Sequence, residues 1–499
     1  MIKKMSFSPT VVVSGALSVL LLAGCNRPPA YKPPQMALAP TWSGEGVFKV
    51  ATPQDGVLRK DWWTLFGDSQ LNQLETQAAA ANPDLQAAAE RYTQARYLTT
   101  IAESRLFPHV GIGAATTDNK SSEHRLFRSP LDPLYGTDES YGAVASWEPD
   151  IWSKIRNTTQ MRKEMAQGSA ADLALTRLSI QAEVASNYML LRGLDVQDAV
   201  YRQSISSYKN AVDITQTRLK GEIAPRSDVT RAQNQLSSTE AQEINVRMQR
   251  SLLEHAIAIL TNQSPTTFHI APADTFTVHV PSIPIGVPST LLQRRPDIAS
   301  AERRMAAANT SIGVSKAAFY PDISIGAMAG FSDDGFGLAN LANSLWSYGM
   351  SGALPLFQGG ARRAELQRSY SEYRQTTDEY RSVVLNAFRE VEDSLSRLRY
   401  LQGEEEKRHE AMTAAVQTQT MQMQLYTGDL TSYLDVVMAQ ISALDARLFE
   451  VEVQTARLEG AVGMVRALGG GWDPSELPTM KSVAPMKATQ YHNLGKPTP

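Results

Sequence analysis

The chain contains one unit twice, and this repeat restricts its possible folds more than any other feature of the sequence. The matched pairs are Asn82–Leu85 with Arg295–Ile298, Leu106–Pro108 with Phe319–Pro321, and Gly221 with Gly428. The offset is 213 residues for the first two pairs and 207 for the third, so about seven extra residues lie in the first copy, between Pro108 and Pro149. Such self-similarity predicts a structure built from two equivalent units.

After Pro108, and again after Pro321, the sequence alternates with a period of two. Apolar side chains take every second position and small or polar ones the positions between, which is typical of strands with one apolar face. We expect four strands, at about 109–118, 139–148, 322–331 and 346–354. Their apolar face would carry Val110, Ile112, Ala114, Tyr141, Ala143, Ala145, Trp147, Ile323, Ile325, Ala327, Ala329, Phe331, Trp346, Tyr348 and Met350.

The sequence after each pair of strands predicts helix. Pro, which a helix interior tolerates poorly, is absent from 150–224, 226–264 and 356–473. In the last run apolar residues recur at spacings of three and four, the heptad pattern of coiled coils. The two seams are Leu366, Tyr370, Tyr373, Thr377, Tyr380, Val384, Ala387, Val391, Ser394, Leu398 and Leu401, and Leu434, Val437, Ile441, Leu444, Leu448, Val451, Thr455, Leu458, Val462 and Val465. A helix of roughly 65 residues is about 100 Å long, so this pattern predicts a rod.

The N-terminus resembles a lipoprotein signal. A basic start precedes an apolar stretch, Val11–Ala23, which is too short for an ordinary spanning helix. It ends in Leu22–Cys25, which resembles a bacterial lipobox, and Cys25 is the only Cys of the chain. The resemblance implies that Cys25 carries N-acyl and S-diacylglycerol lipid and that Asn26 directs the mature chain to the outer membrane. The alternative is an ordinary signal peptide with a chance Cys.

The strands fit a membrane wall. About ten residues suit a tilted membrane strand, and the alternation suits a wall between lipid and water. A soluble four-stranded sheet shares the pattern, but acylation and the aromatic residues at the strand ends favour the membrane. Four strands cannot close a barrel, and an open edge in lipid leaves backbone groups unpaired at several kcal/mol each. The chain is therefore expected to oligomerise.

Composition excludes other classes of protein. Lys and Arg number 48 and Asp and Glu 51, a net charge of −3, so no basic field favours nucleic acid. One Cys excludes a disulfide framework, and the seven His show no close pair at ligand spacing. We expect no enzyme, no metal site and no cofactor apart from the lipid. Met421 and Met423 are candidate ligands for a soft metal, but packing within a helix is the simpler interpretation.

Further motifs follow one another in a single family order. They are Leu22–Cys25, Trp62–Asp68, Asn82–Leu85, Trp147–Trp152, Leu292–Asp297, Pro355–Phe357 and Leu468–Gly471. On these motifs the chain resembles the outer membrane factors of the TolC superfamily, in the NodT/OprM-like lipoprotein branch of resistance-nodulation-division (RND) efflux systems. The resemblance implies a mainly α protein with membrane β-strands, in which a homotrimer closes a 12-stranded β-barrel on a helical periplasmic tunnel. It also implies two partners, a periplasmic adaptor (membrane fusion) protein and an inner-membrane RND transporter.

The domain organisation follows from the repeat. We expect a signal peptide at 1–24, a Pro-rich lipid-anchored tether at 25–60, a first repeat at 61–264, a Pro-rich connector at 265–290, a second repeat at 291–471 and a C-terminal tail at 472–499.

The resemblance places the closed gate and the adaptor contact at the periplasmic tip, where the chain turns back. Gly221 and Gly428 are expected to end the long helices in the left-handed geometry that Gly favours. Asp228 and Asp435 lie seven residues later, where a helix dipole stabilises a carboxylate. Capping alone explains these four residues.

A trimer would surround one end of the tunnel with six such turns. On that hypothesis Tyr433 and Leu434 are the candidates for an apolar constriction, and the two aspartates form acidic rings that favour cations. Many family members carry Asp where this chain has Met438, so the sequence leaves the closure chemistry open.

The favoured function is a passive exit duct of a tripartite efflux pump. A TolC-type protein secretion duct is a second hypothesis, against which the lipobox and Arg294–Asp297 favour the efflux branch. A third is a coiled-coil envelope lipoprotein without a channel, against which the four alternating strands argue. The sequence does not identify the substrate among drugs, dyes, other toxic compounds and metal ions.

Overall fold

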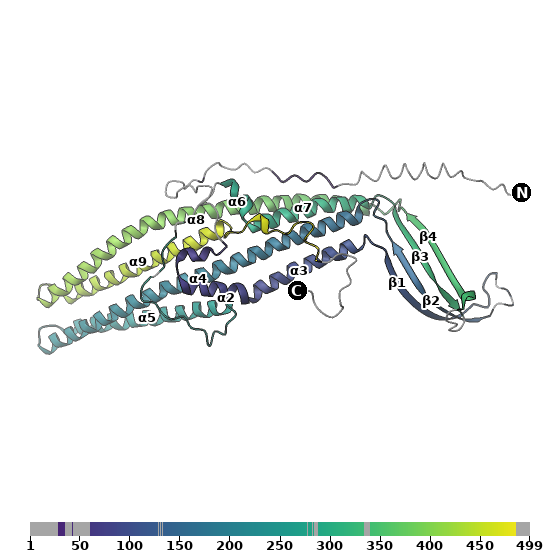
Figure 1. Cartoon of the computed structure of the whole chain (residues 1–499). Coiled ribbons are helices and arrows are strands. Elements are labelled where there is room, and N and C mark those ends of the chain that lie inside the picture. Colours follow the sequence, from purple (N-terminus) through teal and green to yellow (C-terminus); the bar gives the residue numbers. More distant parts are fainter. Residues whose placement is uncertain are drawn as a thin grey trace.

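The structure is a computed structural model that describes residues 28–34, 42, 60–127, 129, 131, 133–276, 278–281, 283, 288–333 and 340–485. Cys25, the signal peptide, most of the tether and the last part of the C-terminal tail lie outside these residues. A sheet lies at one end, and long helices extend from it to a distant tip (Figure 1). No helix in the described part is both long and apolar enough to cross a bilayer.

The helices of the two copies match in length. α3 (Pro83–Ser104) and α7 (Pro296–Ala317) have 22 residues each, α4 (Lys154–Lys220) and α8 (Ala361–Thr427) have 67 each, and α5 (Arg226–Leu260) and α9 (Tyr433–Ala467) have 35 each. Both ends of each pair keep the sequence offset, which is 213 residues for α3 and α7 and 207 for the others. At 1.5 Å per residue α4 and α8 are each about 100 Å long. The duplicated unit and the rod shape are confirmed.

Shorter elements complete the described chain. They are η1 (Trp62–Phe66), α2 (Ser69–Ala81), α6 (Pro288–Arg294), η2 (Leu341–Asn343) and η3 (Pro474–Glu476).

The Asn82 and Arg295 motifs are joints between helices. Asn82 caps α3, since its side-chain oxygen accepts the Leu85 N–H at 3.0 Å, and its amide donates to the carbonyl of Leu260, the last residue of α5, at 2.9 Å. At the equivalent place in the second copy, Arg295 donates to the carbonyl of Ala467, the last residue of α9, at 2.9 Å. The two motifs therefore fasten the start of one helix to the end of another in the same way.

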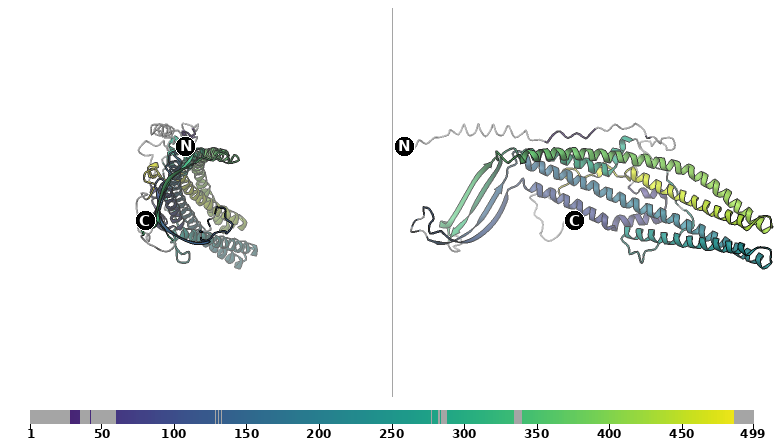
Figure 2. Two further views of the ribbon diagram at one scale, coloured as in Figure 1. Left: turned by 90° about the vertical axis from the view of Figure 1, so that its right-hand side faces the viewer. Right: turned by 180° about the vertical axis from the view of Figure 1, so that it is seen from behind.

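The strands form one antiparallel sheet in the order β1-β2-β3-β4. Their bounds are β1 (His109–Lys120), β2 (Tyr135–Trp147), β3 (Asp322–Asp333) and β4 (Ser344–Ala353). β2 and β3 pair although they come from different copies, which joins the copies into one wall that curves in the end-on view (Figure 2). The strands continue further into the connecting turns than the alternation predicts, and the extra residues of the first copy lie in β2 and in the turn before it.

The register places the expected apolar residues on a single face. Directly opposed residues share a face of a sheet, and Ile112 lies opposite Ala143, Ala143 opposite Ala329, and Ala329 opposite Trp346. The other face carries mainly Gly and Ser, with the larger Val144 opposite Met328 and Leu345 opposite Gly330. The predicted alternation is confirmed across all four strands.

Two apolar clusters hold the helices together. One surrounds Trp62, Tyr188 and Val391 in the middle of the bundle, which we call the waist. The other lies toward the tip and includes Tyr208, Tyr426 and Tyr433. The predicted seam of α8 is buried from Tyr380 to Leu398 except at Ser394, which is half-buried, as expected of helix packing.

Candidate functional site

The two turns at the tip have the same hydrogen bonds. In the first copy Glu222 N–H donates to Leu219 C=O at 3.0 Å and Ile223 N–H to Arg218 C=O at 2.9 Å. In the second, Asp429 N–H donates to Tyr426 C=O at 3.2 Å and Leu430 N–H to Leu425 C=O at 2.9 Å. This is the Schellman pattern, in which the residue after the helix cap takes the left-handed conformation.

The expectation that Gly221 and Gly428 take this conformation is wrong. Their φ values are −83° and −88°, whereas the next residues, Glu222 and Asp429, both have φ of 60°. The reason is the hydrogen-bond register, which places the glycines at the cap itself, one residue before the left-handed position. The backbone of these turns therefore does not require Gly at 221 or 428.

An ion pair joins the two copies at the tip. The guanidinium of Arg218, near the end of α4, pairs with the carboxylate of Asp429 in the turn after α8. The same guanidinium lies 4.8 Å from the ring centroid of Tyr426, a geometry in which a cation is attracted by the ring. The Asp429 carboxylate raises the pKa of Arg218. This contact fastens the α4–α5 turn to the α8–α9 turn.

A second contact joins the same two copies. The Tyr426 hydroxyl donates to the Asp228 carboxylate at 3.3 Å, and Arg231 lies 3.7 Å from the other oxygen of that carboxylate. Burial, and then the charge of Asp228, raises the pKa of Tyr426, so its hydroxyl remains a donor at neutral pH. Asp228 is only 6% exposed. Its expected role in an acidic ring is contradicted, because its carboxylate faces the interior of the chain.

Asp435 differs from its repeat equivalent Asp228. It is exposed at the start of α9, where its carboxylate accepts the hydroxyls of Ser432 at 2.7 Å and Thr431 at 2.8 Å. These hydrogen bonds lower the pKa of Asp435, the Ser432 hydroxyl most strongly. Asp435 therefore caps its helix and stays ionised at the surface.

Tyr433 and Leu434 point in different directions. Tyr433 is 2% exposed and its ring lies 5.1 Å from that of Tyr426, so it belongs to the core and does not meet the expectation of a pore-lining side chain. Leu434 is 47% exposed. Met438 and Ile441 are exposed on the same side of α9, one and two turns later.

The buried face of α9 explains this difference. Near the tip the buried positions include Tyr433, Val436 and Gln440, each one residue before a position of the predicted seam. The seam itself is buried from Leu444 onward except at Leu448, which is half-buried. A straight helix drifts about 20° per heptad relative to a 3.5-residue repeat. The seam therefore moves across the helix, and the heptad positions nearest the tip become exposed.

Sequence reasoning missed Arg218 and Tyr426, which make the two contacts between the copies described above. Their repeat equivalents are Leu425 and Leu219, so neither forms part of a repeated motif. The only signal in the sequence was that each of these positions holds a charged or phenolic residue in one copy and an aliphatic residue at the equivalent position of the other copy.

The described residues before the first helix contact α7 and α8. Asn309 donates to the Pro29 carbonyl at 2.8 Å, the Tyr31 hydroxyl donates to Glu302 Oε1 at 2.5 Å, and the Trp42 ring lies 5.6 Å from that of Phe388. Pro28 lies near Gly313, one turn before the end of α7, the helix that leads into β3. Among these contacts Pro28 is therefore on the sheet side, and Trp42 is on the waist side, beside Phe388.

No group of three or more His, Cys, Asp or Glu in the described residues has the geometry of a metal site.

Comparisons with known proteins agree with this architecture. The family model of the outer membrane efflux protein matches residues 74–263 and 287–470. The chain is 26% identical to the pyoverdine export outer membrane protein OpmQ of Pseudomonas aeruginosa, over 91% of this chain and 95% of that protein. It is 27% identical to nodulation protein T of Rhizobium leguminosarum bv. trifolii, over 91% and 96%. The solved structure of the outer-membrane channel OprN superposes with a TM-score of 0.83 at 26% identity, over 90% of this chain and all of that one.

Proposed function

The chain belongs to the outer membrane efflux protein family, and from this premise we propose how its parts build the exit duct of a tripartite efflux pump. It is an outer membrane efflux channel with a long periplasmic extension. In our proposal three identical chains form the duct, which receives small molecules from a periplasmic adaptor and an inner-membrane transporter. The duct conducts passively and catalyses no reaction.

The single-faced sheet carries this proposal. Among the described residues β1 and β4 each have one edge without a partner strand. A sheet edge in lipid is costly because no water satisfies its backbone groups. If β4 of one chain pairs with β1 of the next chain, three chains close a barrel of twelve strands and no strand edge remains unpaired. The apolar face then meets lipid, and the Gly- and Ser-rich face lines the lumen.

The contacts between the two copies at the tip support a gate. Arg218–Asp429 and Tyr426–Asp228 hold the two helical hairpins of one chain together. In the proposed trimer a wider opening requires these hairpins to separate, so the contacts stabilise the narrow state. Leu434 and Asp435 are the surface residues of the tip that we assign to the constriction.

Gly221 and Gly428 are our candidates for the adaptor contact. Since the backbone of neither turn requires Gly, the absent side chain is better explained by the close approach of a partner. A Cβ at Gly221 would be 3.4 Å from Ile223, an ordinary contact, and at Gly428 3.5 Å from the Gln424 carbonyl. Ala at either position should therefore preserve the turn, and Val should weaken adaptor binding.

We also assign a lipid anchor to Cys25. It lies three residues before Pro28, a reach of about 11 Å in an extended chain, and Pro28 lies near Gly313 in the last part of α7, the helix that leads into β3. An acyl chain at Cys25 would therefore enter the membrane beside the strands. Replacing Cys25 with Ser should abolish labelling by radioactive palmitate without loss of the trimer, and label on the variant would falsify the assignment.

Single-channel recording tests the proposed function. The purified full chain, reconstituted in a planar bilayer, should migrate as a trimer beforehand and then conduct ions in discrete steps. A folded protein that remains monomeric, or a trimer without conductance under conditions that open the tip, would overturn the proposal.

A further inference from the structure

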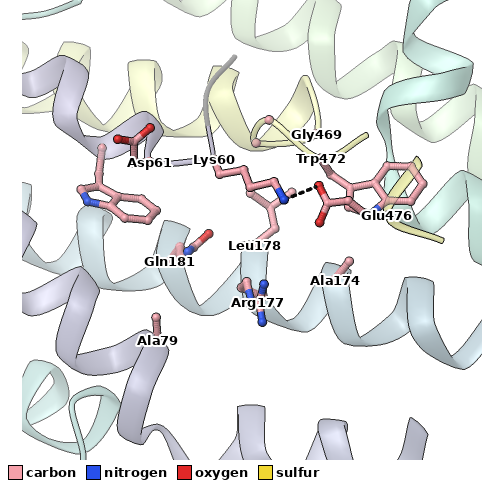
Figure 3. A pocket seen from close by; sticks show the side chains of 13 residues that line it. Lys60, Asp61, Ala79, Ala174, Arg177, Leu178, Gln181, Gly469, Trp472 and Glu476 are labelled. Carbon is pink, nitrogen blue, oxygen red and sulfur yellow. Dashed lines mark ion pairs between the residues drawn. The ribbon is translucent and has the colours of Figure 1, made fainter. Parts of the chain in front are cut away.

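A pocket of about 250 Å³ lies at the waist, and its lining residues belong neither to the sheet nor to the turns at the tip. Figure 3 shows it from close by. Three segments far apart in sequence form most of it. They are the residues up to the start of η1 (Lys60–Trp63), one face of α4 (Ala174–Gln181) and the chain after α9 (Gly469–Glu476). The exit duct proposed above assigns no role to this pocket.

The turn after α9 is built to press against α4. Gly469, Gly470 and Gly471 all have positive φ, at 94°, 58° and 80°, a region open to Gly at no steric cost. A Cβ at Gly469 would overlap the Arg294 carbonyl, and a Cβ at Gly470 would overlap the Leu178 side chain. In this turn Gly469 therefore lies against Arg294 at the end of α6, Gly470 lies against Leu178 of α4, and Trp472 reaches the pocket.

Two polar side chains of α4 lack partners there. Gln181 is 7% exposed and lines the pocket, yet its amide makes no hydrogen bond with any described residue. Arg177, one turn earlier on the same face, makes no ion pair or hydrogen bond in the described part of the chain. Figure 3 shows both on neighbouring turns below Lys60 and Glu476. The Gln181 residue is buried, but its amide is open to the pocket and unpartnered among the described residues, so a ligand in the pocket can pair with it.

The pocket wall carries one unpaired cation and one unpaired carboxylate among the described residues. Lys60 is paired with Glu476 at 3.4 Å, which leaves Arg177 on α4 and Asp61 just before η1. Because these two side chains come from different walls of the pocket (Figure 3), a ligand carboxylate is expected at Arg177, away from Asp61. The Gly471 N–H, on the pocket wall, has no backbone acceptor in the described chain. A single free guanidinium matches a carboxylate, which it can bind through two parallel hydrogen bonds.

The remaining walls suit a small apolar body. Trp63 and Trp472 line the pocket and are half-buried, and indole rings offer a large, rigid apolar surface. The volume lies just below the usual range for sites of drug-sized ligands, so it accommodates a group of the size of an amino-acid residue or two.

The geometry points to a binding site for the carboxyl-terminal residue of a peptide. Arg177 and the Gly471 N–H bind the carboxylate, Gln181 pairs with the preceding peptide group, and the two indoles contact the side chain. The same chemistry is present in a free short peptide and in the terminus of a larger partner.

Calorimetric titration of the purified full-chain trimer tests this site. N-acetyl-Ala-Leu with a free carboxylate should bind, and its carboxyl-terminal amide should bind at least tenfold more weakly. Arg177→Gln and Gln181→Leu should each weaken binding of the acid at least tenfold. Arg91→Gln on α3, also at an exposed arginine, is the matched control and should leave the affinity unchanged.

The outcomes separate this inference from the channel function. Equal binding of acid and amide, no binding of the acid, or unchanged affinity in Arg177→Gln would each overturn it. Conductance and trimer assembly of Arg177→Gln should equal those of the parent chain whatever the pocket binds. A carrier protein whose chain ends in the same two residues identifies the source of the ligand. If both the carrier and the free peptide bind, the ligand is the terminus of a macromolecular partner. If only the peptide binds, the ligand is a free short peptide.

Discussion

At the scale of single residues, burial decides what each side chain can do. Glu75 on α2 is fully buried, and both of its carboxyl oxygens lack a hydrogen-bond partner among the described residues. Its neighbours on the buried face of α2 are Leu71, Leu74 and Ala78. Burial raises the pKa of Glu75 from 4.5 to about 9, so this carboxyl is neutral in the folded chain at pH 7.

The free energy of unfolding should therefore fall as the pH rises from 4.5 to about 9. Below 4.5 both states hold the proton of Glu75; between 4.5 and about 9 the unfolded chain loses it and the folded chain keeps it. Glu75→Gln removes this cost and should raise the free energy of unfolding by roughly 3 kcal/mol at pH 7, and by more at pH 8. Thermal unfolding of the trimer at pH 5, 7 and 8 measures the effect. Glu90→Gln, at an exposed residue, is the control. If the stability gained in Glu75→Gln does not increase with pH, the raised pKa of Glu75 is contradicted.

Truncation of Tyr433 and of Leu434 to Ala should affect the stability of the chain very differently. Tyr433→Ala leaves a cavity beside Tyr426 and should destabilise the chain by roughly 3–5 kcal/mol, the range for large aromatic side chains in cores. Leu434→Ala, at the surface, should change stability by no more than about 0.5 kcal/mol and raise the resting conductance. Thermal unfolding and single-channel recording of both variants provide the comparison. Similar destabilisation by the two variants would show that Leu434 also belongs to the core.

At the scale of elements, the two faces of the sheet should differ in how well they tolerate a charged side chain. Ile325 lies opposite Trp147 and Met350 on the apolar face, whereas Gly326 lies opposite Ser146 and Gly349 on the other. A Cβ at Gly326 meets nothing within 4 Å, so a side chain fits there. The seam between β2 and β3 is tighter, because a Cβ at Gly142 would lie 2.5 Å from the Ala329 carbonyl oxygen.

Arginine at the two neighbouring positions should separate assembly from conduction. Ile325→Arg places a charge toward lipid at a cost of roughly 2–4 kcal/mol near the middle of the bilayer, and should reduce the yield of trimer. Gly326→Arg should leave the trimer intact and lower the conductance for cations. Native electrophoresis and single-channel recording are the measurements. Equal loss of trimer in both variants would remove the assignment of the faces.

At the scale of the whole molecule, the two repeats act as two arms fastened at the tip. Arg218→Ala removes the ion pair with Asp429 and the contact with the Tyr426 ring. An ion pair with one exposed partner contributes up to about 1 kcal/mol and a cation–π contact about 0.5–1 kcal/mol. The open probability should therefore rise roughly 5- to 30-fold, the ratio that one or two kcal/mol produces.

A matched ion pair within one repeat is the control for this gate. Lys209 pairs with Glu240 at 3.3 Å, between α4 and α5 of the same copy, so Lys209→Ala should leave the open probability unchanged. High salt screens exposed charges, so it should open the parent channel and have less effect on Arg218→Ala. Equal open probabilities in Arg218→Ala and the parent would show that the arms are held together elsewhere.

The sequence by itself determined the local and repeated features, because periodicity and turn chemistry act over a few residues. The alternation from Val110 to Met350 assigned the strand faces, the absence of Pro predicted the long helices, and the matched motifs revealed the duplication. Only the tertiary structure decided which side chains meet across the two copies. The pairing of β2 with β3, the contact of Arg218 with Asp429 and the burial of Tyr433 beside Tyr426 join residues far apart in the chain. Such contacts depend on helix drift and strand order, which no local pattern of the sequence encodes.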